Sequence, residues 1–375
     1  MQSFEAVAAR APDRADRRGT WIALSALSVI ALMVGILGAT DALDPGGGPG
    51  PATPQAQAAF GRAETARMLA ATGPGVVAVL AMHTTGGTTR ASGICVGADQ
   101  VLTSAHVLEG GAPVMIVTPD GEQPALPVGV DYDTHLALLR IGEPKLSPLD
   151  LAPPDRLRLG DPVLAVAVDG DEYWRSVGVV GAVDQLVATA YSVVAGLFDT
   201  ETGAADEHSG GVVLNESGAV VGLLTVPPGG GPSGLALPIE VALAVGAQLE
   251  SEGRVRHGWL GVSGTDASDR AAGGARVEEV LVGSPAETAG LGSGDLIIEV
   301  GERGAKTSVS NMAALMAQVR ARPPGATLEI TVLRDGQRVA IVAELGEKEP
   351  PTPPAPPAPE PPTPVPVEPA ETATP

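Results

Sequence analysis

Residues 206–215, with the sequence DEHSGGVVLN, decide how the rest of this chain is interpreted. Ser209 is followed by two glycines and an apolar run, which indicates a hydroxyl group on a tight turn that leads into a buried strand. A nucleophilic serine needs such a turn, because backbone N–H groups there can stabilise the oxyanion of acyl transfer. Ser-Gly-Gly is also common in ordinary loops, so the nucleophile hypothesis requires a general base elsewhere.

A candidate base lies about a hundred residues upstream, in the sequence QVLTSAHVL at residues 100–108. The apolar run predicts a strand, and His106 stands at its edge, where the strand would fix its backbone. A base that precedes its nucleophile is the chain order of the chymotrypsin arrangement. His106 and Ser209 are therefore the predicted general base and nucleophile.

The composition narrows the classes of function. The 375 residues suffice for about two domains with tails. A net charge of −21 argues against nucleic-acid binding, because a phosphate-binding face needs clustered Lys and Arg. The single cysteine, Cys95, allows no intrachain disulfide, and we expect it to be a small buried apolar side chain.

The N-terminal region predicts a membrane anchor. Residues 19–40 carry no charge and are long enough, at 1.5 Å per residue, to span about 30 Å of hydrocarbon. Within them, Trp21–Leu37 is almost entirely apolar. Arginines precede this segment and aspartates follow it, which favours a cytoplasmic N-terminus. A cleaved signal peptide is the alternative, but its apolar region would be only about 7–15 residues long. We expect a cytoplasmic segment at residues 1–19, a single transmembrane helix at residues 20–40 in the cell membrane, and an extracytoplasmic remainder.

After a Gly/Pro-rich linker and a short helix at residues 41–73, the pattern changes to short β-branched runs between glycine-containing turns. This pattern favours an all-β barrel or sandwich over residues 74–250, closed by a helix at Ile239–Leu249. The predicted strands are Val76–Ala81, Gly93–Val96, Gln100–Leu102, Val114–Val117, Leu136–Ile141, Pro162–Val168, Val177–Val183, Gly211–Leu214 and Val220–Thr225.

A second domain is predicted at residues 257–346. It contains a helix at Asn311–Arg320 and a hairpin whose strands meet at Asp335-Gly336, a strong two-residue turn signal. The tail at residues 347–375 is Pro-rich and acidic and lacks the apolar content of a core, so we expect it to be extended.

Together these motifs resemble the HtrA/Deg family of trypsin-like serine proteases with a C-terminal PDZ domain. The family's T-[SA]-A-H-V motif is matched at Thr103–Val107, and its G-N-S-G-G-P-L-x-N motif is matched in part at Glu207–Asn215. Gly160–Val163, Gly234–Ile239 and Gly253–Val262 resemble further family segments. The resemblance covers Pro74 to Glu344 and implies a mainly β fold, in which a chymotrypsin-like double β-barrel precedes a PDZ domain.

The resemblance also implies a serine endopeptidase that acts on unfolded or C-terminally exposed polypeptides, with no metal or cofactor, and homotrimers as the family's assembly. The N–H groups of Glu207 and Ser209 would form the oxyanion hole. Gly203 would lie near the base of the specificity pocket and would favour small or apolar side chains. In the PDZ region, the backbone at Trp259, Leu260, Gly261 and Val262 would hold a peptide's C-terminal carboxylate.

The chain departs from the family where the triad aspartate is expected, because His135 precedes Leu-Ala-Leu there. A neutral imidazole can accept a hydrogen bond from His106 Nδ1, but it cannot offset the imidazolium charge as a carboxylate does. Asp133 lies two residues back, roughly 6.6 Å along the strand, so it could substitute only after local rearrangement. A Ser-His-His triad is the functional hypothesis for His135, and a histidine in a site that no longer needs aspartate is the alternative.

Two further departures lie beside the nucleophile. Glu207 replaces the family's oxyanion glycine, which costs about 1–2 kcal/mol if that position needs a positive φ. Val212 replaces a proline, which we expect to be tolerated. A zinc site formed by His106, His135 and His208 is a further hypothesis, but no spacing signature supports it. The sequence thus predicts a weakened or inactive membrane-anchored endopeptidase, with a pseudoprotease that acts as a PDZ scaffold or regulator as the alternative.

Overall fold

The computed structural model describes residues 54–83, 86–118, 121–143, 146–149, 151, 157–170, 172–189, 191–225, 234–267 and 273–351, which belong to one compact unit. The transmembrane helix predicted at residues 20–40 lies outside these residues, as does the tail from residue 352 onward. Within the described ranges, no helix has the length and apolar character needed to cross a bilayer.

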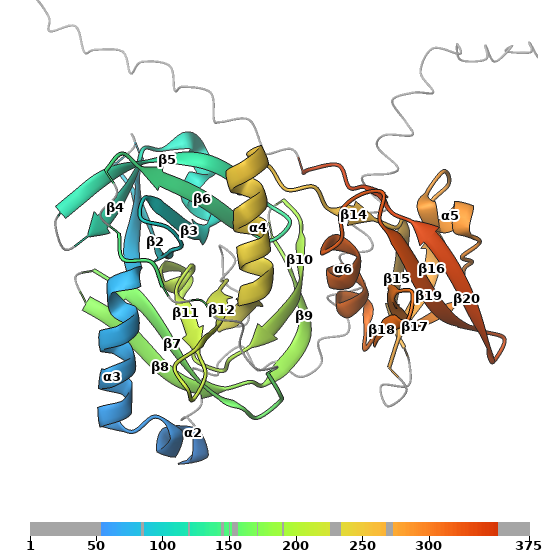
Figure 1. Cartoon of the computed structure of the whole chain (residues 1–375), viewed down its shortest axis with the longest axis horizontal. Coiled ribbons are helices and arrows are strands. Elements are labelled where there is room, and N and C mark those ends of the chain that lie inside the picture. The colour runs from blue at the N-terminus through green and yellow to red at the C-terminus, as the bar shows by residue number, and fades with distance from the viewer. Residues whose placement is uncertain are drawn as a thin grey trace, which may run out of the picture. The chain divides into compact units, whose positions relative to one another are not determined.

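Six antiparallel strands close into a barrel in the order β1-β2-β3-β6-β5-β4 (Figure 1). Their alternating apolar side chains, among them Val79, Ile116 and Leu139, fill the interior. Cys95 is fully buried in this core, as predicted, and burial raises the pKa of its thiol to about 12. The strands are β1 (Val76–Met82), β2 (Thr88–Cys95), β3 (Gln100–Ser104), β4 (Val114–Thr118), β5 (Gly121–Asp131) and β6 (Leu136–Ile141).

The second half of the trypsin-like domain is a seven-stranded sheet rather than the closed second barrel that the resemblance implied. Its order is β8-β7-β11-β12-β13-β10-β9, so among the described residues β8 and β9 remain as edges. Both edge strands are half exposed, and only Val180 and Gly181 separate them along the chain. The strands are β7 (Pro162–Asp169), β8 (Glu172–Val179), β9 (Ala182–Ala188), β10 (Val193–Asp199), β11 (Val212–Leu214), β12 (Val220–Leu224) and β13 (Leu235–Pro238).

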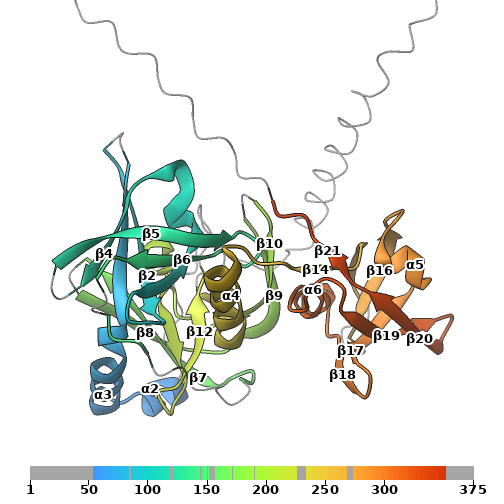
Figure 2. The ribbon, with the colours of Figure 1, turned by 45° about the horizontal axis from the view of Figure 1, so that its top comes forward.

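Helices cover both halves of this domain. Helix α4 (Ile239–Glu252) follows β13 and packs against β5 and β6 of the barrel and β12 of the sheet (Figure 2). The single short helix predicted near residues 58–71 is two helices, α2 (Pro54–Ala59) and α3 (Arg62–Thr72). The break falls at Gly61, whose ψ of 157° is extended, because glycine is a poor helix former.

The C-terminal domain is built on the sheet β15-β16-β17-β19-β20, with β18 beside β17 and a separate β14–β21 pair. The predicted hairpin is confirmed as β19 and β20, and the predicted helix as α6, whose Asn311 side chain caps the Ala314 N–H at 2.8 Å. The elements are β14 (Gly258–Trp259), β15 (Val262–Asp266), β16 (Ala275–Val280), α5 (Pro285–Ala289), β17 (Leu296–Glu302), β18 (Ala305–Ser308), α6 (Met312–Arg320), β19 (Thr327–Arg334), β20 (Gln337–Glu344) and β21 (Gly346–Glu347).

Candidate active site

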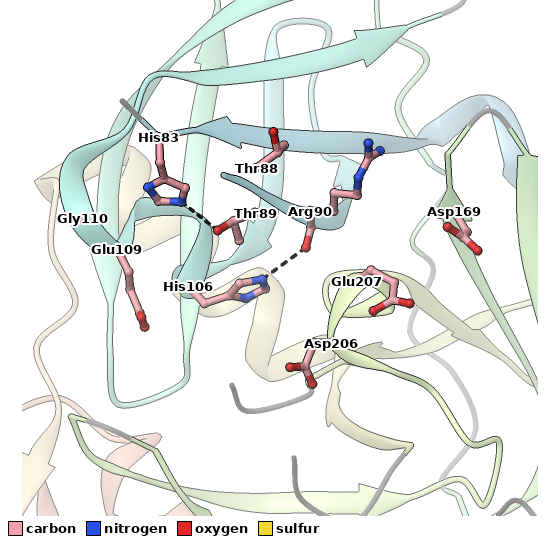
Figure 3. Close-up of a pocket in the computed structure, with 10 residues that line it drawn as sticks. All are labelled: His83, Thr88, Thr89, Arg90, His106, Glu109, Gly110, Asp169, Asp206 and Glu207. Atoms are coloured by element: carbon pink, nitrogen blue, oxygen red, sulfur yellow. Dashed lines mark hydrogen bonds between the residues drawn. The ribbon is translucent and has the colours of Figure 1, made fainter. Parts of the chain in front are cut away.

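His106 lies where the sequence places it, directly after β3, in a 3₁₀ helix over Ala105–Gly111. Its side chain is 7% exposed and borders a pocket of about 620 Å³ (Figure 3). Burial lowers the pKa of His106, against a weaker opposite effect of the Arg90 carbonyl and Asp206, so its imidazole is neutral at pH 7. The pocket is lined by His83, Thr88, Thr89, Arg90, His106, Glu109, Gly110, Asp169, Asp206 and Glu207.

The two ring nitrogens of His106 have different partners. Nδ1 is 2.8 Å from the Ser104 hydroxyl oxygen, and Nε2 is 3.4 Å from the Arg90 carbonyl oxygen. In a trypsin-type triad, Nδ1 donates to the aspartate, which fixes the tautomer of the base. Here that nitrogen bonds Ser104, so the contact from His106 Nδ1 to His135 that we had considered is not formed.

His135 ends the turn between β5 and β6 with a φ of +59°, a conformation that histidine adopts more readily than most residues. Its side chain is 1% exposed, and its ring lies nearly parallel to that of His106, with centroids 6.0 Å apart. Both ring nitrogens are buried without a hydrogen-bond partner among the described residues. Burial, and to a lesser degree the charge of His106, lowers the pKa of His135 to about 4.

This depressed pKa predicts a loss of stability in acid. A folded-state pKa of about 4, against 6.5 for a free imidazole, means that the unfolded chain binds a proton that the folded chain refuses. The contribution of neutral His135 to the free energy of unfolding is therefore fully present above pH 6.5. It is lost as the pH falls towards 4, by roughly 3 kcal/mol in total. Urea unfolding of the wild type and of His135→Asn at pH 7.5 and pH 4 measures this loss of stability. An equal loss in both proteins would remove His135 as the cause.

Asp133, the other acid considered for the triad, is engaged elsewhere. Its carboxylate accepts hydrogen bonds from Ser192 and from Lys348, with Lys348 Nζ 2.8 Å from one oxygen, and Arg320 lies 3.9 Å away. The Asp133 side chain is 3% exposed, and its two cationic partners come from the C-terminal part of the chain. Rearrangement towards His106 would leave two cations without their partner, so Asp133 does not replace the missing aspartate.

Asp131, the last residue of β5, accepts hydrogen bonds from Thr134 at 2.6 Å and from His257 Nε2 at 2.9 Å. Burial alone would lower the pKa of His257, but Asp131, the Arg320 carbonyl and Asp133 together raise it. Asp131, Asp133 and His257 form the one group within the described ranges whose three ligand atoms lie close enough for a metal. Lys348 and Arg320 already neutralise this group, which disfavours a further cation.

The zinc site considered for His106, His135 and His208 is not formed. His208 stacks on Trp174 instead, with centroids 3.9 Å apart and ring planes 16° apart. Its Nδ1 accepts the Ala205 N–H at 2.9 Å. This stacking supports the turn that precedes the nucleophile.

Ser209 follows a 3₁₀ turn, Asp206–His208, and leads into β11 as predicted. Gly210 has a φ of +87°, and a Cβ there would lie 2.0 Å from the Ser92 carbonyl oxygen, so only glycine fits. Ser209 itself is fully buried. The glycine that follows Ser209 is thus required because the backbone of Gly210 lies close to the backbone of Ser92.

One of the two predicted oxyanion donors is already engaged in this arrangement. The Ser209 N–H donates to the Asp206 carbonyl oxygen at 3.0 Å, which closes the 3₁₀ turn. It can donate to an oxyanion only after this bond breaks. Glu207 has no positive φ, so the strain that a non-glycine residue would incur is not present in this conformation. Its side chain faces the pocket with Asp206 (Figure 3).

Gly203 lies on the loop between β10 and the nucleophile turn, with a φ of +69°. It is not among the residues that line the His106 pocket. Its place in a specificity pocket stays a prediction.

The predicted carboxylate loop lies between β14 and β15. Leu260 is buried in the core of the C-terminal domain, and Val262 begins β15, which is an edge strand of the sheet. Gly261 has a φ of +83°, and a Cβ there would lie 2.3 Å from the Ser284 side chain. An edge strand beside a glycine-containing loop is the geometry that β-strand addition of a peptide needs.

Two known family models match the chain. The trypsin-like peptidase domain matches residues 91–223, and the PDZ domain matches residues 248–333. The chain is 31% identical over 271 residues to the periplasmic serine endoprotease DegP of Escherichia coli K12, a match over 68% of this chain and 56% of DegP. It is 30% identical over 272 residues to the periplasmic pH-dependent serine endoprotease DegQ of the same strain, over 68% of this chain and 58% of DegQ.

The chain thus spans little more than half the length of these curated relatives. Among solved structures, the HtrA-type protease AlgW with a tripeptide superposes with a TM-score of 0.61 at 28% identity, over 76% of this chain and 98% of that one. The order of the two domains agrees with these matches. The chain belongs to the HtrA/Deg family of trypsin-like serine proteases with a PDZ domain.

Proposed function

We propose that this chain is an extracytoplasmic HtrA-type serine endopeptidase of low catalytic power. Ser209 is its nucleophile and His106 its general base. One observation carries the proposal: a single pocket is lined by His106 and by Asp206 and Glu207, the first two residues of the turn that precedes Ser209 (Figure 3). The pocket therefore joins the base to the turn that carries the nucleophile.

Low activity follows from two features of this site. His106 has no carboxylate on Nδ1, since that nitrogen bonds Ser104 Oγ. The Ser209 N–H must also leave Asp206 before it can stabilise an oxyanion. Both costs fall on the transition state rather than on substrate binding, so kcat is affected more than KM.

The C-terminal domain supplies the proposed recognition of polypeptide termini. A peptide would add to the free edge of β15, with its carboxylate at the loop around Leu260 and Gly261. Periplasmic relatives support an extracytoplasmic location. Anchoring through residues 20–40 and assembly into trimers remain part of the proposal.

The test is cleavage of casein at high enzyme concentration by the wild type and by Ser209→Ala. We expect slow cleavage in the wild type that the variant lacks. Equal rates in both proteins would refute the endopeptidase.

The second candidate is a pseudoprotease that binds peptides as a scaffold, and the full burial of Ser209 favours it. Peptide binding that survives Ser209→Ala but is lost on deletion of residues 258–346, in a chain without cleavage, would establish this alternative.

A further inference from the structure

His106 contacts one side chain through its Nδ1, and that side chain is Ser104, the last residue of β3. Ser104 is 2% exposed, so water does not compete strongly for its hydroxyl. The Nδ1–Oγ distance of 2.8 Å is that of a well-formed hydrogen bond. Ser104 therefore occupies the place that the triad carboxylate takes in an active trypsin-like site.

The second partner of His106 fixes the tautomer. A carbonyl oxygen only accepts, so the Nε2 contact with Arg90 requires the proton on Nε2. The buried imidazole is neutral and carries a single proton, so Nδ1 is unprotonated and accepts from the Ser104 hydroxyl. A base in this tautomer cannot take the proton of Ser209, because Nε2, the nitrogen that must receive it, already holds one.

The structure points to Ser104, and not His135, as the positioning residue of His106. We propose that its hydroxyl lets the base exchange between an idle tautomer, with the proton on Nε2, and a working tautomer, with the proton on Nδ1. A hydroxyl can donate in the first and accept in the second, whereas a carboxylate can only accept. This inference rests on the proposed endopeptidase activity.

In the working tautomer the atoms balance without a further reactant. The Ser209 hydroxyl proton passes to His106 Nε2 as Oγ bonds the scissile carbonyl carbon, while Nδ1–H donates to Ser104 Oγ. The same proton then passes from Nε2 to the leaving amine as the carbon–nitrogen bond breaks. Water repeats the sequence to release the acyl group. Ser104 touches only the base and never the substrate.

His135 does not share this role. Its two ring nitrogens lack partners within the described ranges, and Ser104 already occupies His106 Nδ1. The charged groups that border the His106 pocket are Glu109, Asp169, Asp206, Glu207 and Arg90, whereas the side chain bonded to Nδ1 is that of Ser104. Ser104 is therefore the side chain whose removal should alter the tautomer.

The first experiment is ¹⁵N NMR of the histidine-labelled full chain in a Ser209→Ala background. We expect His106 to show a protonated Nε2 and an unprotonated Nδ1. Ser104→Ala should shift the Nδ1 signal, and Ser104→Thr should return it, because threonine keeps the hydroxyl. Ser251→Ala, which removes an exposed hydroxyl on α4, is the matched control and should leave His106 unchanged. The inference would be overturned if His106 were protonated on Nδ1 in this background, or if its ¹⁵N signals did not change in Ser104→Ala.

The second experiment is kinetic and uses the Ser209-containing chain. Ser104→Ala should lower kcat about tenfold with KM unchanged, the size of one neutral hydrogen bond, and Ser104→Thr should restore kcat. Cleavage that depends on Ser209 but not on Ser104 overturns the positioning role alone. Absence of any Ser209-dependent cleavage overturns the proposed function, and the NMR signals then still report the tautomer.

Discussion

Replacing His135 by aspartate is expected to raise kcat for peptide cleavage by up to about 10⁴-fold, the factor lost when the triad carboxylate of another trypsin-like enzyme is removed. The carboxylate would hold the proton of His106 on Nδ1 and would stabilise the imidazolium that forms in the transition state. Aspartate also tolerates the φ of +59° at this position. The His106 and His135 ring centroids are 6.0 Å apart, so the two side chains already share one buried space.

His135→Asn is the matched control, since asparagine has the size and backbone tolerance of aspartate without its charge. Steady-state cleavage of one peptide by the three proteins separates charge from shape. A rise in kcat for aspartate alone supports the carboxylate as the missing part. If both variants remain at the wild-type rate, either Ser104 keeps His106 Nδ1 or the closed 3₁₀ turn at Ser209 limits this site.

Asp133→Asn is expected to lower the free energy of unfolding by about 3–5 kcal/mol, the usual cost of breaking a buried ion pair from one side. Asp133 is 3% exposed, and Lys348 and Arg320 would keep their charges without a partner. Burial, the largest single influence, raises the pKa of Asp133, but the hydrogen bonds from Lys348 and Ser192 and the charges of Arg320 and Lys348 together hold that pKa below its usual range.

Urea unfolding at pH 7.5 measures this cost. Glu299→Gln is the control, because Glu299 pairs with Arg338 on an exposed surface where ion pairs contribute little. The stability should change far less in the control. Equal losses in the two variants would show that the Asp133 contacts do not stabilise the folded chain.

Much of the fold could be predicted because its strands are apolar and bounded by glycine. The prediction for β6 matches its bounds, Leu136–Ile141. In contrast, β5 was missed, because Pro124, Pro127 and Gly129 are unusual within strands. The structure accommodates them with a register shift between Pro127 and Gly129. The strand predicted at Val177–Val183 covers the end of β8 and the start of β9, which a break at Val180 and Gly181 separates.

In the active site, too, some features could be predicted from the sequence and others could not. His106 and Ser209 could be located from local motifs, since a strand end and a glycine turn position them. The partner of His106 could not, because Ser104 reaches Nδ1 through side-chain rotamers that sequence spacing does not specify. The contact between Lys348 and Asp133 spans 215 residues and leaves no local signal. The second sheet likewise pairs strands that lie far apart in the chain, such as β7 and β11.

The most direct test of a competent serine with a weak base is the rate constant for labelling of Ser209 by a fluorophosphonate, measured in the wild type, His135→Asp and Ser209→Ala. Labelling needs the nucleophile and its base but no particular peptide sequence. We predict slow labelling of the wild type, faster labelling of His135→Asp and none of Ser209→Ala. The claim of a competent serine with a weak base would be contradicted if the wild type and His135→Asp were both labelled no faster than Ser209→Ala.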